Sequence, residues 1–192
     1  GLRGTGKTTL AKALLEVWPT ERRFIFDPMG EFNDCGEAFY SATDAAKALQ
    51  SGRSNVRLCG GPDDAEDILD VLRETDQILM VFDEADLFLS AHNIPEPFRW
   101  ITSYGRHANQ GVILVSRRPA ELPRQFTAQS TLFFGPVYEP RDILYIKQRL
   151  GYAAPQPPQY EWYAHTLSGE LVHFPASWAW SLTHNGTSSG NT

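Results

Sequence analysis

The sequence predicts an α/β domain built on a mainly parallel sheet. Short apolar runs typical of buried strands alternate with helical segments along most of the chain. Two of these runs are followed directly by acidic residues, at the strand ends where open α/β sheets bind ligands. The 192 residues are enough for one such domain with a full core, and too few for two comfortable ones.

The first nine residues fit the phosphate-loop pattern of a glycine, four residues and then Gly-Lys-Thr. Glycines let the backbone curl so that its N–H groups point at a phosphate. Lys7 can reach the β- and γ-phosphate oxygens, and the Thr8 hydroxyl is placed to ligate Mg²⁺. A Gly/Thr-rich turn that matches by chance is the alternative. The predicted nucleotide-binding residues are Arg3, Gly4, Thr5, Gly6, Lys7, Thr8 and Thr9.

A helix is expected directly after this loop, because Leu10, Leu14 and Leu15 recur at helical spacing. The N-terminal dipole of that helix would favour the same anion. A phosphate loop hangs from the end of a buried strand, so we expect at least one hydrophobic strand before Gly1. Nothing in the residues present resembles a signal peptide.

The first apolar run, Phe24–Phe26, predicts a short strand that ends in Asp27-Pro28-Met29-Gly30-Glu31. Proline and glycine stop the strand and turn the chain. Asp27 therefore has two interpretations, a ligand-binding acid at the sheet edge or a cap of the turn.

The second run, Ile78–Phe82, is continuously apolar, as in a strand buried on both faces. Asp83 and Glu84 follow it. Downstream of a phosphate loop, Asp83 is expected to hold Mg²⁺, and Glu84 to polarise the attacking water as a base. The alternative is that both acids are a solvated strand end.

The remaining elements follow the same alternation, which implies a parallel sheet with crossover helices. Helices are expected at 42–50, from Asp63 or Asp64 to about 72, at 98–108, around 123–129 and at 141–150, and strands at 55–58, 112–115 and 131–134. A proline-rich linker and a β-hairpin of residues 160–165 and 171–174 come next. Its tyrosines and tryptophans could stack on bases, but we favour an edge hairpin that covers the core. The predicted organisation is a core at 1–150, a linker and hairpin packed on it at 151–180, and a disordered tail at 181–192.

The composition argues against several classes of protein. No apolar run approaches the ~18 residues of a membrane-spanning helix. The net charge of −6 argues against a monomer that coats DNA. Cys35 and Cys59 have no metal-ligand spacing and indicate reduced intracellular thiols. The five histidines are scattered, so we expect no zinc site.

Five arginines and only one acid lie between residues 99 and 124. They could stabilise a phosphoryl group in a neighbouring subunit's site, contact a DNA backbone, or form a solvated basic face. Arg106 and Arg117 flank the fourth strand, so we select them as catalytic candidates beside Lys7 and Glu84.

Taken together, these motifs resemble the FtsK–HerA superfamily of ring-forming DNA-pumping ATPases, over about residues 1–150. Within it, the chain is most similar to the small genome-packaging ATPases of tailless, membrane-containing viruses. The resemblance is carried by 1–8, 27–31, 81–85, Tyr104-Gly105-Arg106-His107, the 112–115 strand and Ser116-Arg117-Arg118-Pro119. Where the family has the glutamine of Thr-Gln-Arg-Pro as γ-phosphate sensor, this chain has Arg117. A guanidinium can contact phosphate but cannot accept a hydrogen bond from water.

The resemblance implies a P-loop NTPase fold of the RecA-like (ASCE) type, a three-layer sandwich with a mainly parallel sheet and a C-terminal β-hairpin. It implies ATP and Mg²⁺ as cofactors and a homo-oligomeric ring, pentameric or hexameric, with double-stranded DNA passing transiently through its channel. Capsid vertex or membrane proteins would be further partners, with the host cytoplasm and the virion as locations. The alternatives are a related secretion or conjugation ATPase and a nucleotide-gated binding switch.

Overall fold

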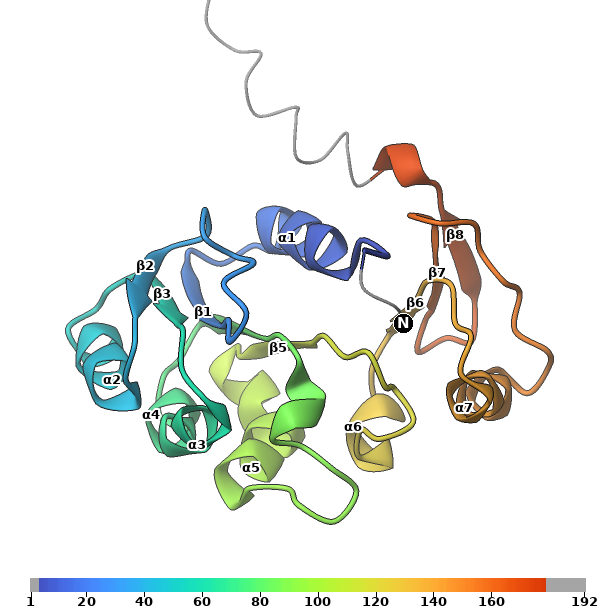
Figure 1. Ribbon diagram of the computed structural model, residues 1–192. Coiled ribbons are helices and arrows are strands. Elements are labelled where there is room, and N and C mark those ends of the chain that lie inside the picture. The colour runs from blue at the N-terminus through green and yellow to red at the C-terminus, as the bar shows by residue number, and fades with distance from the viewer. Residues whose placement is uncertain (1–3, 179–192) are drawn as a thin grey trace, which may run out of the picture. The chain divides into compact units, whose positions relative to one another are not determined.

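The computed structural model describes residues 4–178 and divides into two compact units (Figure 1). Residues 18–116 form one unit, and the described residues before and after them, 4–17 and 117–178, form the other. The predicted binding residue Arg3 and the predicted disordered tail at 181–192 lie outside the described residues.

The unit of residues 18–116 contains a five-stranded sheet in the order β2-β3-β1-β4-β5. Every pairing in it is parallel, and Phe24 lies opposite Met80 while Val81 lies opposite Ile113. The predicted parallel sheet is therefore confirmed. Its strands are β1 (Arg22–Phe26), β2 (Glu37–Phe39), β3 (Asn55–Leu58), β4 (Ile78–Phe82) and β5 (Gly111–Leu114).

The core of this unit surrounds β4, whose five residues are all buried. Phenylalanine rings from β1, β4, the turn after β4 and one helix pack beside it, with ring centroids 5.3 to 6.1 Å apart. The rings are those of Phe24, Phe26, Phe82, Phe88 and Phe98. Burying each such side chain contributes about 1.5–3 kcal/mol, so the ends of β1 and β4 are firmly positioned.

Helices α2, α3, α4 and α5 gather on one face of this sheet (Figure 1). Their bounds are α2 (Ala42–Gln50), α3 (Pro62–Asp67), α4 (Leu69–Arg73) and α5 (Glu96–Tyr104), with 3₁₀ turns η1 (Ala85–Leu87) and η2 (Gly105–Ala108). The helix that we expected to begin with Asp63 or Asp64 as its N-cap begins earlier. Gly61 is the N-cap of α3, and the Asp64 side chain reaches back to accept from the Gly61 N–H at 2.9 Å. Within residues 4–178, no helix has the length and apolar character required to cross a bilayer.

The other unit contains a three-stranded antiparallel sheet in the order β6-β7-β8. Its elements are α1 (Lys7–Val17), α6 (Arg124–Thr127), β6 (Leu132–Phe134), α7 (Pro140–Leu150), β7 (Trp162–His165) and β8 (Leu171–Phe174). Apolar side chains of α7, among them Tyr145 and Ile146, pack with Phe134 in its core. The predicted hairpin is confirmed. The expectation that β6 extends the parallel sheet was wrong, because β6 pairs with β7 instead.

The side chain of Gln110, just before β5, closes the C-terminal end of α4. Its Nε2 donates to the carbonyls of Leu72, Arg73 and Thr75 at 3.0, 3.1 and 2.8 Å. A Cβ added at Gly105 would lie 2.5 Å from Gln110 Oε1, so the glycine makes room for this amide. Gln110 thus fastens η2, which carries Arg106, to α4.

Replacing Gln110 by leucine is expected to lower the free energy of unfolding by about 1–3 kcal/mol, because part-buried carbonyls lose their donor. Urea titration followed by circular dichroism measures this. The matched control is Gln50→Leu at an exposed position of α2, which should change stability by less than about 0.5 kcal/mol. Equal stability of the two variants would contradict the capping role.

Candidate functional site

The predicted phosphate loop is a glycine turn that opens directly into α1. Gly4 and Gly6 have φ of +75° and +85°, in the left-handed region that favours glycine. The Gly6 carbonyl accepts from Leu10 N at 2.9 Å, so Lys7, Thr8 and Thr9 form the first turn of the helix. The first N–H groups of a helix have no partner within it, and an anion is a natural one. The local backbone therefore has the shape that phosphate binding needs.

Aromatic side chains from the segment leading into β7 lie against this loop. A Cβ added at Gly6 would be 3.4 Å from Tyr160 Cδ1 and 3.8 Å from Trp162 Nε1. A Cβ at position 6 would only touch these rings at ordinary van der Waals distance, so it is the positive φ that favours glycine there. Sequence reasoning missed this contact, because the residues are more than 150 positions apart and the aromatic residues were interpreted as part of an edge hairpin.

The acidic end of β4 lies in the unit of residues 18–116. Backbone hydrogen bonds continue past the strand: Asp83 N donates to Phe26 O at 3.0 Å, and Ala85 N to Val115 O at 2.9 Å. The Asp83 residue is 2% exposed. Glu84 has φ 49° and ψ 46°, a left-handed backbone that is uncommon for a residue with a side chain. Such strain is found at functional sites when neighbouring structure enforces it.

Several acids share this edge. Burial raises the pKa of Asp83 to about 7, and the negative charges of Glu84, Glu31 and Asp27 add to the rise. A carboxylate in this setting has a strong electrostatic preference for a cation, and carboxylate oxygens are the ligands that Mg²⁺ prefers. These acids favour a cation near Asp83, but among residues 4–178 they do not form a group of three or more side chains that could hold a metal ion by themselves.

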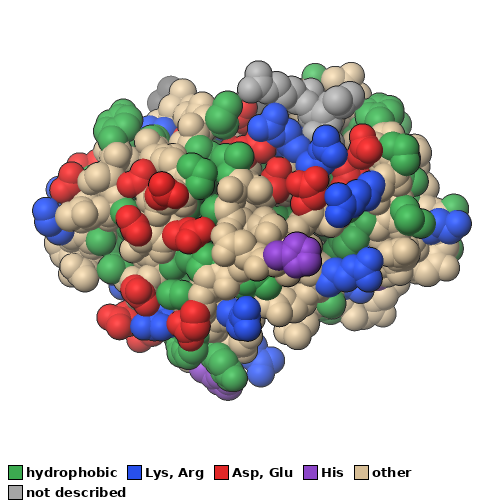
Figure 2. Space-filling view, turned by 60° about the horizontal axis from the view of Figure 1, so that its bottom comes forward, with side chains coloured by type: hydrophobic (Ala, Val, Ile, Leu, Met, Phe, Trp, Pro, Cys, Tyr) green, Lys and Arg blue, Asp and Glu red, His purple; other side chains and the backbone are tan. Residues whose placement is uncertain are grey.

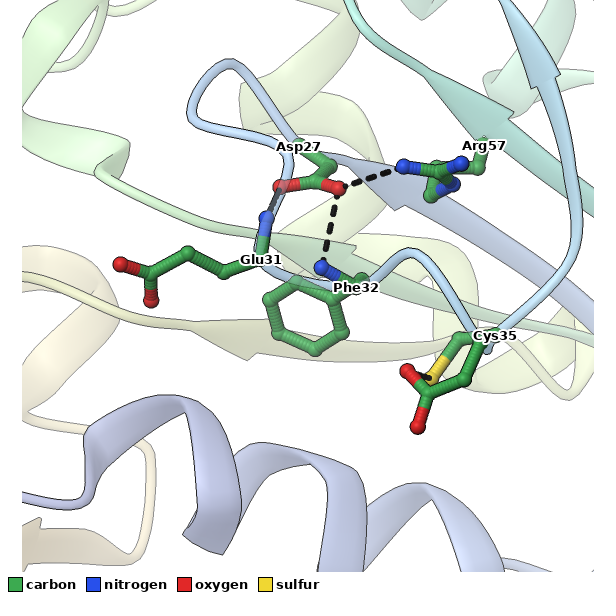
Figure 3. Close-up of polar contacts among 6 residues, drawn as sticks. Asp27, Glu31, Phe32, Cys35 and Arg57 are labelled. Carbon is green, nitrogen blue, oxygen red and sulfur yellow. Dashed lines mark hydrogen bonds and ion pairs between the residues drawn. The ribbon is translucent and has the colours of Figure 1, made fainter.

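Asp27 organises the turn after β1 (Figure 3). Its carboxylate accepts from the backbone N–H groups of Glu31 at 2.8 Å and Phe32 at 3.0 Å. Arg57 Nη1, from β3, donates to the same carboxylate at 3.0 Å, and the Asp27 side chain is 0% exposed. The turn-cap interpretation of Asp27 is confirmed. Glu31, which the sequence placed with Asp27 at a strand end where ligands bind, is held in an exposed position by the turn and adds negative charge near Asp83.

Arg106 and Asp83 lie beyond opposite ends of β4 in the five-stranded sheet. Arg106 is exposed on η2, and Ala108 at the end of η2 accepts from Gln77 N at 2.8 Å, just before β4 begins. Asp83 comes after β4 ends, with the whole strand between them. Arg106 could therefore act on a nucleotide near Asp83 only from a second copy of the chain.

The other arginines of the 99–124 segment are divided between the two units. Arg117 is half-buried and belongs to the unit that contains the phosphate loop. Arg124 donates to Gln148 Oε1 at 3.1 Å. The face drawn in Figure 2 mixes basic and acidic side chains, so no broad basic surface is visible on it.

A parallel α/β sheet together with a glycine turn that opens a helix defines the P-loop NTPase class of folds. Solved structures of this class include the genome packaging NTPase B204 from Sulfolobus turreted icosahedral virus 2. Its complex with ATP-gammaS matches at a TM-score of 0.76 and 19% identity, over 92% of this chain and 94% of that one. Its complex with AMPPCP matches at a TM-score of 0.76 and 17% identity, over 91% of this chain and 94% of that one.

The DNA-packaging ATPase B204 from Sulfolobus Turreted Icosahedral Virus matches at a TM-score of 0.71 and 17% identity, over 91% of this chain and 94% of that one. At these identities the likeness shows the fold. No family model and no curated protein matches the sequence.

Proposed function

We propose that this chain is an ATP hydrolase that translocates double-stranded DNA. It would act as one subunit of a viral genome-packaging motor of the FtsK–HerA type. The observation that supports this most is the likeness in fold to B204, a genome packaging NTPase solved with AMPPCP and ATP-gammaS. The glycine turn before α1 and the buried acidic end of β4 supply the residue types that ATP hydrolysis needs.

In this proposal the phosphate loop binds the triphosphate through the backbone of Gly4–Gly6 and the Lys7 ammonium, with Arg3 and Thr9 at its two ends. Thr8 and Asp83 hold Mg²⁺, which when bound offsets charge on the β- and γ-phosphates. Glu84 accepts a proton from the water whose oxygen attacks the γ-phosphorus, and the bond from that phosphorus to ADP breaks.

The active form is proposed to be a homo-oligomeric ring, pentameric or hexameric, that works in the host cytoplasm on DNA bound for the capsid. Arg106 would reach the site of an adjacent subunit, which its position beyond the end of β4 opposite to Asp83 supports. Arg117, at the family's sensor position, would contact the γ-phosphate. Residues 1–150 would form the ATPase core and 151–180 a linker and hairpin packed on it.

The test is the rate of ATP hydrolysis with and without double-stranded DNA, measured together with native mass at the same concentration. We expect a magnesium-dependent rate that double-stranded DNA raises, and an oligomeric mass. Lys7→Ala should abolish turnover, and Arg106→Ala should do the same in a protein that still assembles. A monomeric mass with no stimulation would contradict the motor. Equally low rates for wild type and Glu84→Gln would support a nucleotide-gated switch instead.

A further inference from the structure

The residues leading into β7 form a tight turn whose third residue is a tyrosine with positive φ. Glu161 N donates to the Pro158 carbonyl at 3.1 Å, so the chain reverses over residues 158–161. Tyr160, the third residue of this turn, has φ of +66°. That position normally carries glycine or asparagine, because a bulky side chain with positive φ is strained. Backbone strain of this kind clusters at active sites and ligand clamps, so the position is a candidate for a ligand contact.

The turn directs two consecutive side chains at the phosphate loop. Gln159 Nε2 donates to the Gly4 carbonyl at 3.4 Å. The Tyr160 ring is the nearest neighbour of the position that a Cβ on Gly6 would take, at 3.4 Å. Gly4, Gly6 and this turn belong to the same compact unit, so the contact is internal to it.

The two aromatic residues beside Gly6 differ in how much surface they leave free. Trp162 is 6% exposed, and a Cβ added at Gly135 would lie 3.2 Å from its ring, so the indole is packed on a second side as well. Tyr160 is 51% exposed. Trp162 therefore supports the loop from within the unit, whereas Tyr160 keeps an aromatic surface open to a ligand beside the loop.

We propose that Tyr160 forms the base-stacking wall of the nucleotide site. This inference rests on the proposed function, because it requires a nucleotide whose phosphates are held by the loop of residues 4–8. A nucleotide anchored there has an aromatic base within reach of the residues that flank the loop. Stacking on a base is tolerant of its identity, since every base has a π-face, so Tyr160 contributes affinity for nucleotides in general.

The experiment compares two ligands that share the phosphates and differ in the base. Wild type and variants are titrated with Mg-ATP and with magnesium tripolyphosphate by isothermal calorimetry. Tyr160→Gly removes the ring and also suits the positive φ, so it leaves the turn intact. We expect it to weaken ATP binding by about 5- to 150-fold, the range that corresponds to losing one stacking contact, and to leave tripolyphosphate binding unchanged.

Two further variants are controls. Tyr160→Phe keeps the ring and should bind both ligands as wild type does. Tyr152→Ala removes a similarly exposed tyrosine, 49% exposed, from the same unit and should change neither affinity. GTP should lose affinity in Tyr160→Gly to a similar degree as ATP.

Each other outcome overturns the inference in a recognisable way. Equal losses for ATP and tripolyphosphate would mean that Tyr160 only braces the loop. Unchanged ATP binding would mean that the base lies elsewhere. If wild type binds neither ligand and Lys7→Ala behaves identically, the proposed nucleotide site itself fails, and the role of Tyr160 fails with it.

Discussion

Replacing Glu84 by glutamine is expected to slow ATP hydrolysis by about 10²- to 10⁴-fold, the usual contribution of a general base. Glutamine keeps the size and shape of the side chain and removes its ability to take a proton from water. ATP binding should persist, because the phosphate loop is unchanged. Steady-state phosphate release, together with ATP titration by calorimetry, measures both quantities.

Loss of fold can be separated from loss of chemistry in this variant. Glu84 adds negative charge beside Asp83, whose pKa is raised by burial and then by this neighbour. Removing the charge should therefore leave thermal stability equal to that of wild type or higher. Glu74→Gln, at an exposed position, is the matched control and should keep full activity. A Glu84→Gln protein with wild-type turnover would show that another group activates water.

Replacing Arg57 by leucine is expected to lower the free energy of unfolding by about 3–5 kcal/mol, the usual cost of breaking a buried ion pair from one side. The Arg57 and Asp27 side chains are 11% and 0% exposed, with their charged atoms 3.0 Å apart. The variant leaves a buried carboxylate with backbone N–H donors and no cation. Chemical denaturation with guanidinium chloride, followed by tryptophan fluorescence, measures the change.

The chain supplies a control of the same chemical type. Arg53 pairs with Glu37 at 2.6 Å, but these side chains are 60% and 49% exposed. Arg53→Leu should cost no more than about 1 kcal/mol, because solvent screens exposed pairs. If both arginine variants lost the same small amount, the Asp27–Arg57 pair would not be what fixes the turn after β1.

Local sequence patterns predicted those helices and strands whose own residues show a helical or strand pattern, without the help of a distant partner. The all-apolar Ile78–Phe82 run and the helix at 42–50 were predicted with the bounds that the structure gives. The β2 strand was missed because Glu37–Phe39 carries no apolar pattern and is a strand only through pairing with β3. The orientation of β6 was wrong because its partner β7 lies about 30 residues further along the chain.

The residues of the candidate site divide in the same way, into those that a local motif identifies and those whose role depends on a partner far along the chain. Motif spacing identified the glycine turn at 4–6 and the acids at 83–84, since each is a short stretch with its own chemistry. It could not decide between the two interpretations of Asp27, because the deciding partner, Arg57, is on another strand. It assigned Tyr160 to a hairpin that covers the core in preference to base stacking, because nothing in the sequence Pro-Pro-Gln-Tyr reveals a left-handed backbone or contact with Gly6. Whether Lys7 and Asp83 serve one nucleotide stays a prediction.

Among residues 4–178, four non-glycine residues have positive φ: Gln77, Glu84, Asn109 and Tyr160. Glycine or asparagine at these positions relieves strain of about 1–2 kcal/mol, and Asn109 already has that form. A laboratory selection for heat tolerance alone would therefore favour such changes at 84 and 160. The clones that survive heating best would then have lost Glu84 and Tyr160, the proposed base and the proposed stacking residue. Such a screen must therefore measure the rate of ATP hydrolysis as well as the melting temperature.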